Sequence, residues 1–162
     1  MPSLLRLSLI VVLLTAAGCA SSSRAYQGTP SDRDAVVQVV NDLFDAMRRQ
    51  DGQAMRALHM PEVALVRVPE NAAPTVRLGS PDAFINSIVN APAEPRERMW
   101  DAEVRIDGNL ATLWAPYDFH LGDNFSHCGV DALQLVRTNT GWRIASIAYT
   151  VHREDCDHAP PP

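Results

Sequence analysis

Lysine is absent from this 162-residue chain, and all 14 of its basic residues are arginine. Catalysis through a lysine Schiff base is therefore excluded. Acidic residues outnumber basic ones by 19 to 14, and the formal net charge at pH 7 is −5. Because an acidic chain is repelled by a phosphate backbone, no nucleic acid partner is predicted.

Several motifs of known chemistries are also absent from the sequence. The chain has no glycine-rich phosphate loop, no nucleophile elbow and no internal repeat, so phosphoryl transfer and serine hydrolysis have no support. Only three cysteines occur, and their spacing to histidines is not that of a structural zinc site. Neither a metal nor a cofactor is predicted. With 46% hydrophobic residues, the chain has room for one domain with a substantial core.

The first 18 residues have the pattern of a bacterial secretory signal. The basic Arg6 precedes an apolar run from Leu7 to Leu14, which is too short to span a membrane. The run ends in Ala-Ala-Gly before Cys19, and this resembles a lipobox. The resemblance implies that Cys19 becomes the lipidated first residue and anchors the protein, since several acyl chains bind a membrane stably. The alternative is a plain secretion signal with cleavage nearby.

A polar segment, residues 19–31, is predicted to be a flexible tether. Ala20 stands where an inner-membrane retention signal often has aspartate, so we expect the periplasmic face of the outer membrane. Residues 157–162 are predicted to form a disordered tail. The folded domain is therefore expected to span residues 32–156.

Three helices are predicted before the main sheet. Ser31 or Asp32 is the expected N-cap of the first, whose apolar residues recur at helical spacing through about Arg49. A second, short helix is predicted at 53–59, with Pro61 ending it. Strands follow at 63–68 and 75–78, and a third helix begins near residue 80. Its inward-facing side chains are expected to be Phe84, Ile85, Ile88 and Val89.

The second half of the chain predicts an antiparallel sheet. Residues 96–98 are interpreted as a charged connector, and tight turns are predicted at 107–109 and 138–141. Three helices followed by a long curved sheet make an α+β arrangement. The four strands of this predicted meander are residues 100–106, 110–120, 126–137 and 142–152.

Element order and local sequence together carry a family resemblance. The sequence reads YDF at 117–119, HCGVDALQL at 127–135 and GWRIASIAYT at 141–150. From 32 to 152 the chain resembles the nuclear transport factor 2-like superfamily, a cone-shaped α+β fold shared by ketosteroid isomerases, SnoaL-type polyketide cyclases and scytalone dehydratase. Locally it is similar to bacterial proteins of the putative lumazine-binding and SnoaL-like types. The resemblance implies a fold but no activity, because none of the family's catalytic sets matches this sequence residue by residue.

The turn at residues 139 and 140 predicts the pairing of the last two strands. The predicted pairs are Ile144 with Leu135, Ala148 with Asp131, and His152 with His127. A bulge would invert part of this assignment, and the apolar Ile147, which is out of phase with Ile144, indicates one. The residues then expected to line the concave face or its mouth are Tyr117, Phe119, His127, Asp131, Thr150 and His152.

Asp131, His127 and Tyr117 are the candidate catalytic residues. Asp131, on a central strand, is interpreted as a general base or ligand-binding group with a pKa raised by burial, or as a structural carboxylate. His127 is its acid or base partner, or part of the polar rim. Tyr117 and Tyr149 either donate to a ligand or pack in the core with satisfied hydroxyl groups.

Cys128 and Cys156 remain as a pair once Cys19 is acylated, and an oxidising compartment favours a disulfide between them. The predicted register places Cys128 opposite Val151, so a chain that turns back after residue 152 brings Cys156 within reach. The alternatives are a catalytic cysteine and a metal site drawn from His127, Cys128, His152, Cys156 or His158.

Three functional hypotheses follow. The first is a lipid-anchored periplasmic module that holds a small, partly apolar ligand. The second is an isomerase, dehydratase or cyclase-type enzyme that uses Asp131 with His127 or Tyr117 for proton transfer beside a carbonyl. The third is an interaction module of the cell envelope, a homodimer packed through the other sheet face. That face is expected to carry Trp114, Val130, Ala132, Ile147 and Tyr149.

Overall fold

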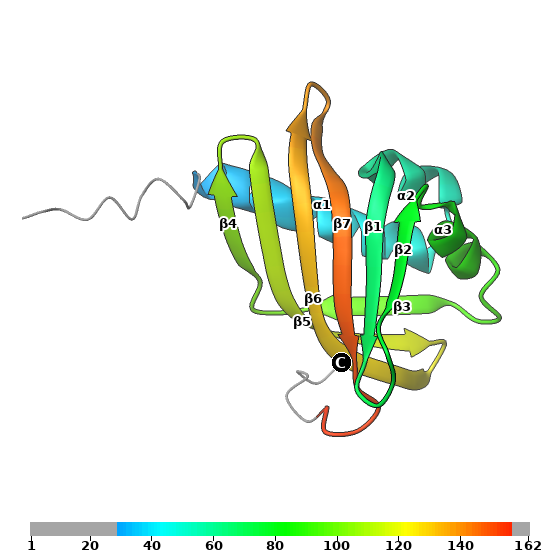
Figure 1. The fold of residues 1–162 in the computed structure, drawn as a ribbon. Coiled ribbons are helices and arrows are strands. Elements are labelled where there is room, and N and C mark those ends of the chain that lie inside the picture. The colour runs from blue at the N-terminus through cyan, green and yellow to red at the C-terminus, as the bar shows by residue number, and fades with distance from the viewer. Residues whose placement is uncertain (1–28, 157–162) are drawn as a thin grey trace, which may run out of the picture.

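The computed structural model describes residues 29–156, which form three helices and seven strands (Figure 1). The predicted signal peptide, Cys19, nearly all of the predicted tether and the predicted tail lie outside the described residues. The predicted α+β class is confirmed. The elements are α1 Pro30–Arg48, α2 Gly52–Leu58, β1 His59–Pro69, β2 Thr75–Gly79, α3 Asp82–Val89, β3 Pro95–Met99, β4 Glu103–Asp107, β5 Leu110–Leu121, β6 Asn124–Thr138 and β7 Gly141–Val151. None of the helices within 29–156 is long and apolar enough to cross a membrane.

Helix α1 begins with a capping box. The Thr29 side chain accepts a hydrogen bond from the Asp32 amide, and the Asp32 carboxylate accepts one from the Thr29 amide. The prediction that Ser31 or Asp32 is the N-cap is therefore wrong. The reason is Pro30, which has no N–H to satisfy and is favoured at the first helical position, so the cap lies just before it.

Helix α2 passes directly into β1. The helix ends at Leu58, so the prediction that it includes His59 and is ended by Pro61 is wrong. Pro61 lies inside β1, where the pairing with β7 is interrupted between His59 and Ala64. A proline has no ladder donor, and this irregular stretch tolerates it.

Six strands lie side by side in the order β2-β1-β7-β6-β5-β3, and β4 also pairs with β5. Only β1 and β7 run parallel, and the predicted antiparallel meander from β4 to β7 is confirmed. The interpretation of 96–98 as a connector is wrong, because these residues form the middle of β3. Strand β5 is long enough to serve two partners. Its first part pairs with β4, and its last part, residues 117–121, pairs with β3.

A bulge lies between β6 and β7. Leu135 faces Ile144 as predicted, but the register shifts by one residue between Leu135 and Gln134, which faces Ser146. The predicted partnerships of Asp131 with Ala148 and His127 with His152 are therefore wrong by one position. Asp131 faces Tyr149, and His152 forms an isolated bridge with Cys128.

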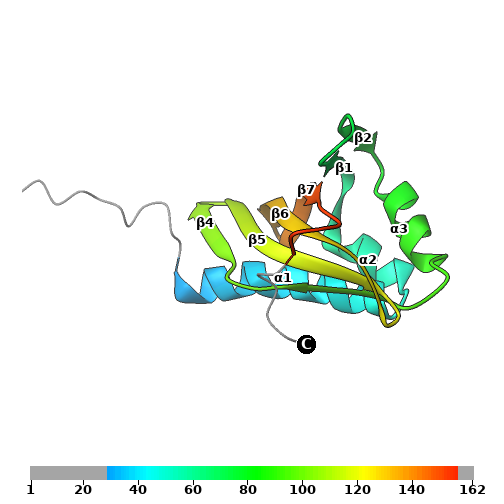
Figure 2. The same cartoon turned by 90° about the horizontal axis from the view of Figure 1, so that it is seen from below.

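Helix α1 lies beneath the curved sheet, along its concave side, and α3 stands next to α2 (Figure 2). The buried face of α1 packs on apolar residues of the sheet, each of which contributes about 2 kcal/mol when fully buried. On α3, Ile85 and Ile88 are buried as predicted. Val89 is instead 37% exposed, so its predicted inward position is wrong.

The predicted disulfide between Cys128 and Cys156 is confirmed. Cys128 also exchanges both backbone hydrogen bonds with His152, at 3.0 and 2.9 Å. The disulfide ties the chain after β7 back to β6, at the end of the sheet where β3 crosses.

Candidate functional site

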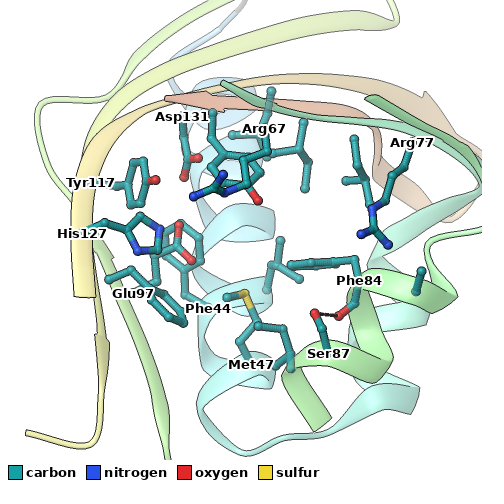
Figure 3. Close-up of a pocket in the computed structure, with 18 of the residues that line it drawn as sticks. Phe44, Met47, Arg67, Arg77, Phe84, Ser87, Glu97, Tyr117, His127 and Asp131 are labelled. Carbon is teal, nitrogen blue, oxygen red and sulfur yellow. Dashed lines mark hydrogen bonds between the residues drawn. The ribbon is translucent and has the colours of Figure 1, made fainter. Parts of the chain in front are cut away.

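A cavity of about 360 Å3 opens between the concave side of the sheet and helices α1 and α3 (Figure 3). Its apolar part consists of side chains from α1, α3, β1, β5, β6 and β7. On α1 they are successive positions of one helical face, which is why the same periodicity that builds the core also builds this wall. The apolar side chains include Leu43, Phe44, Met47, Phe84, Leu133 and Ile147.

Two carboxyl groups meet on the side of the cavity away from α3. Glu97 of β3 and Asp131 of β6 are joined by a side-chain hydrogen bond. Asp131 is 4% exposed, whereas Glu97 keeps partial access to the open cavity although protein atoms crowd its carboxyl group.

Burial dominates the proton affinity of this pair. It raises the pKa of Asp131 to about 7, and the hydrogen bond from Glu97 offsets part of the rise. Burial, the negative charge of Asp131 and the hydrogen bond to it raise the pKa of Glu97 well above its usual value. Near neutral pH the Asp131 carboxyl is therefore partly protonated, and the pair carries less than two full negative charges.

Three polar rings surround the carboxyl pair. The Tyr117 hydroxyl donates to the carbonyl oxygen of Thr150 at 2.7 Å, and its ring packs edge-on against His127 and Tyr149, with centroids 5.8 and 6.5 Å away. Burial raises the pKa of both tyrosines, so they are neutral phenols. Burial, helped by nearby arginine charges, lowers the pKa of His127 to about 4, so its ring is neutral at pH 7.

Two guanidinium groups also face the cavity. Arg67 extends from β1, where its backbone pairs with Tyr149, and Arg77 extends from β2 (Figure 3). Arg67 is partly buried, and Arg77 is exposed at the rim. Among residues 29–156, neither guanidinium has a hydrogen-bond or ion-pair partner.

The structure brings four of the six predicted ligand-contacting residues together. Tyr117, Phe119, His127 and Asp131 line the cavity. Thr150 and His152 do not, because the bulge turns them away. The Thr150 hydroxyl accepts a hydrogen bond from the Val130 amide at 2.8 Å, and the His152 ring lies 3.5 Å from the Glu70 carboxylate at the end of the sheet.

The same bulge moves Ile147 and Tyr149 into the cavity, so their predicted position on the other sheet face is wrong. Glu97, Arg67 and Arg77 also line the cavity, although the sequence did not predict them there. The position of Glu97 could have been found if residues 95–99 had been interpreted as a strand. Such a strand pairs with the end of β5 and places Glu97 opposite Phe119, which was already expected in the cavity.

The arrangement can bind and orient a small molecule, and it can hold or move one proton at the Asp131 carboxyl. A carboxyl group with a pKa near 7 is suited to general acid or base chemistry. Within residues 29–156, no group of three or more His, Cys, Asp and Glu side chains is placed to hold a metal ion.

Comparisons with known proteins give the same fold. A protein of unknown function with a cystatin-like fold from Nostoc punctiforme superposes with a TM-score of 0.64 at 11% identity, over 79% of this chain and 96% of that one. A protein described as a putative dehydratase of the NTF2-like family from Streptomyces avermitilis gives 0.62 at 16% identity, over 77% and 99%. At such identities the likeness shows the fold alone.

A protein of unknown function from Mycobacterium tuberculosis is equally similar, with a TM-score of 0.64 at 18% identity over 81% of this chain and 82% of that one. No curated protein matches the sequence. Residues 31–150, most of the chain, match the model of a family described as putative lumazine-binding. The chain therefore belongs to that family, and it shares the fold of the solved proteins described as NTF2-like and cystatin-like.

Proposed function

We propose that this protein is a lipid-anchored periplasmic module that binds a small, partly apolar molecule in its cavity. The observation that carries the proposal is the cavity itself: about 360 Å3 with apolar walls and a few convergent polar groups at one side. The family description makes lumazine, a planar heterocycle, one compound to test.

The proposed location rests on the sequence. The lipobox-like Ala-Ala-Gly-Cys at 16–19 supports lipidation, and Ala20 supports the outer membrane. The disulfide between Cys128 and Cys156 supports export, since such bonds persist in oxidising compartments.

Native mass spectrometry tests the binding role. The chain from Ala20 onward would be exported behind a signal peptide that lacks the lipidation cysteine, and purified gently. We expect a small mass to be retained. The matched control is Ala83→Phe: Ala83 is exposed on α3 and lines the cavity, so a phenyl group there obstructs the cavity without entering the core. A protein without any retained mass, and without affinity for lumazine by calorimetry, would overturn the proposal.

A second candidate is an enzyme that moves a proton beside a carbonyl. It is favoured by one observation, the buried Asp131 with a pKa of about 7 at the cavity wall. If a retained molecule is identified, exchange of its acidic C–H hydrogen in D2O can be followed by NMR. The enzyme role predicts exchange that Asp131→Asn slows by 100-fold or more. An unchanged exchange rate in this variant excludes Asp131 as the base.

The convex face of the sheet supports a homodimer, compatible with either role. Five apolar residues form a row across five neighbouring strands, and its two ends are well exposed, Trp114 at 53% and Val76 at 58%. An apolar stripe of this kind is typical of an interface. We expect light scattering to show a dimer for the wild type and a monomer for Trp114→Glu. A monomeric wild-type chain would exclude the homodimer. The row consists of Trp114, Ala132, Ala148, Val66 and Val76.

A further inference from the structure

Arg67 has an unusual position for a charged side chain. It lies on β1, inside the sheet, and it points into the cavity toward the side that holds Tyr117, His127 and Asp131 (Figure 3). It is partly buried, yet its guanidinium has no hydrogen-bond or ion-pair partner among residues 29–156. A buried or half-buried cation normally has such a partner.

The carboxyl groups of the cavity do not neutralise Arg67. Glu97 and Asp131 are hydrogen-bonded to each other, and Arg67 is not among the charges that shift the pKa of either group. Burial also raises the pKa of Asp131 to about 7, so near neutral pH this carboxyl is partly protonated and the pair supplies less than two negative charges.

Arg77 adds a second positive charge at the rim. Arg77 lies on β2 and pairs with Leu65 of β1. Arg67 is two residues after Leu65 on β1, so the side chains of Arg67 and Arg77 are on the same face of the sheet. The only charged side chains that line the described cavity are these two arginines and the carboxyl pair, since His127 is neutral. The cavity of an acidic protein thus carries an excess of positive charge.

We propose that the cavity selects small organic anions, whose acidic group accepts hydrogen bonds from the Arg67 guanidinium while an apolar body lies against Phe44, Met47 and Phe84. This inference rests on the proposed binding function and names its ligand class. A guanidinium fork matches a carboxylate or sulfonate, and the partly desolvated site strengthens the charge-assisted hydrogen bonds. Arg77 strengthens the attraction at the entrance.

The test uses two fluorescent probes that differ in one group. The first is 8-anilino-1-naphthalenesulfonate, an anion, and the second is N-phenyl-1-naphthylamine, which has the same rings without the sulfonate. We expect the anion to bind about tenfold more tightly than the neutral probe, and its affinity to fall as salt is raised. Both probes are expected to lose binding in Ala83→Phe, which places them in the cavity.

Arg67→Gln is the critical variant. It should weaken binding of the anion about tenfold and leave the neutral probe unchanged, which also shows that the cavity is intact. Arg67→Lys should restore part of the loss, because it keeps the charge without the fork. Arg105→Gln is the matched control, since Arg105 lies on β4 outside the cavity and should change neither affinity.

The outcomes separate this inference from the proposed function. If the neutral probe binds in the cavity as tightly as the anion, or Arg67→Gln weakens both equally, anion selection is wrong and the binding function stands. If both probes bind to Ala83→Phe as they do to the wild type, or neither binds the wild type, the binding function fails and the inference falls with it.

Discussion

Replacing Asp131 with asparagine should change how the stability of the fold depends on pH. Asp131 is 4% exposed, and burial raises its pKa from 3.8 to about 7. The folded state binds the proton of the Asp131 carboxyl more tightly than the unfolded chain does. The stabilisation that comes from this protonated carboxyl is therefore fully present below pH 4. It is lost as the pH rises through about 7. Glu97, whose pKa is raised well above its usual value, adds to the loss at higher pH.

The size of the effect follows from the pKa values. A tenfold change in proton affinity corresponds to about 1.4 kcal/mol, so a rise from 3.8 to about 7 corresponds to about 4 kcal/mol between pH 4 and pH 8. An asparagine amide cannot ionise, and its oxygen still accepts the hydrogen bond from Glu97. The variant should therefore match the wild type near pH 4 and exceed its free energy of unfolding by up to about 4 kcal/mol at pH 8.

Urea unfolding of both proteins from pH 4 to pH 8, with the disulfide intact, measures this difference. Asp107→Asn is the control, because Asp107 is exposed at the turn between β4 and β5 and should leave the pH profile of the wild type unchanged. Parallel profiles for Asp131→Asn and the wild type, or a variant that is less stable at pH 8, would refute the argument that the carboxyl pair is strained by burial.

Three further predictions concern other parts of the chain. Replacing Cys128 and Cys156 by serine should lower the free energy of unfolding by about 3 kcal/mol in urea, and reduction of the wild type should have the same effect; equal stability before and after reduction would contradict this. Gly129→Ala should destabilise by about 2 kcal/mol or more, because the added Cβ would lie 2.3 Å from the Thr150 carbonyl oxygen; an unchanged thermal midpoint would be inconsistent with that contact. Cys19→Ser should abolish labelling by radioactive palmitate and release the protein from membranes, and a labelled variant would rule out Cys19 as the acceptor.

The fold could be predicted from the sequence where its signals are local. The turns at 107–109 and 138–141 fix two hairpins, and the apolar spacing on α1 fixes its buried face. Strand β3 could not be found in this way, because Arg96, Glu97 and Arg98 read as a charged loop. The strand forms because the far end of β5 offers it a partner, and that pairing joins residues about twenty positions apart.

The candidate site was harder to predict because it depends on one inserted residue. The mismatch between Ile144 and Ile147 indicated a bulge, but the sequence does not locate it, and a shift by one position moves every later side chain to the other face. In the structure the bulge turns Thr150 outward and brings Tyr149 opposite Asp131. The polar side of the cavity therefore contains a second phenol in place of an alcohol.

The curvature of the sheet completes the site. Glu97 of β3 pairs with Phe119 of β5, and Phe119 pairs with His127 of β6. His127 lies four residues from Asp131 along β6. In a flat sheet those four residues would span about 13 Å, too far for a hydrogen bond between the two carboxyl groups. The groups nevertheless meet, because β5 and β6 bend and carry β3 across the direction of β7 (Figure 1). The bend creates the cavity and also sets the proton affinity of Asp131, so substitutions that flatten β5 should lower the pKa of Asp131 along with the cavity volume.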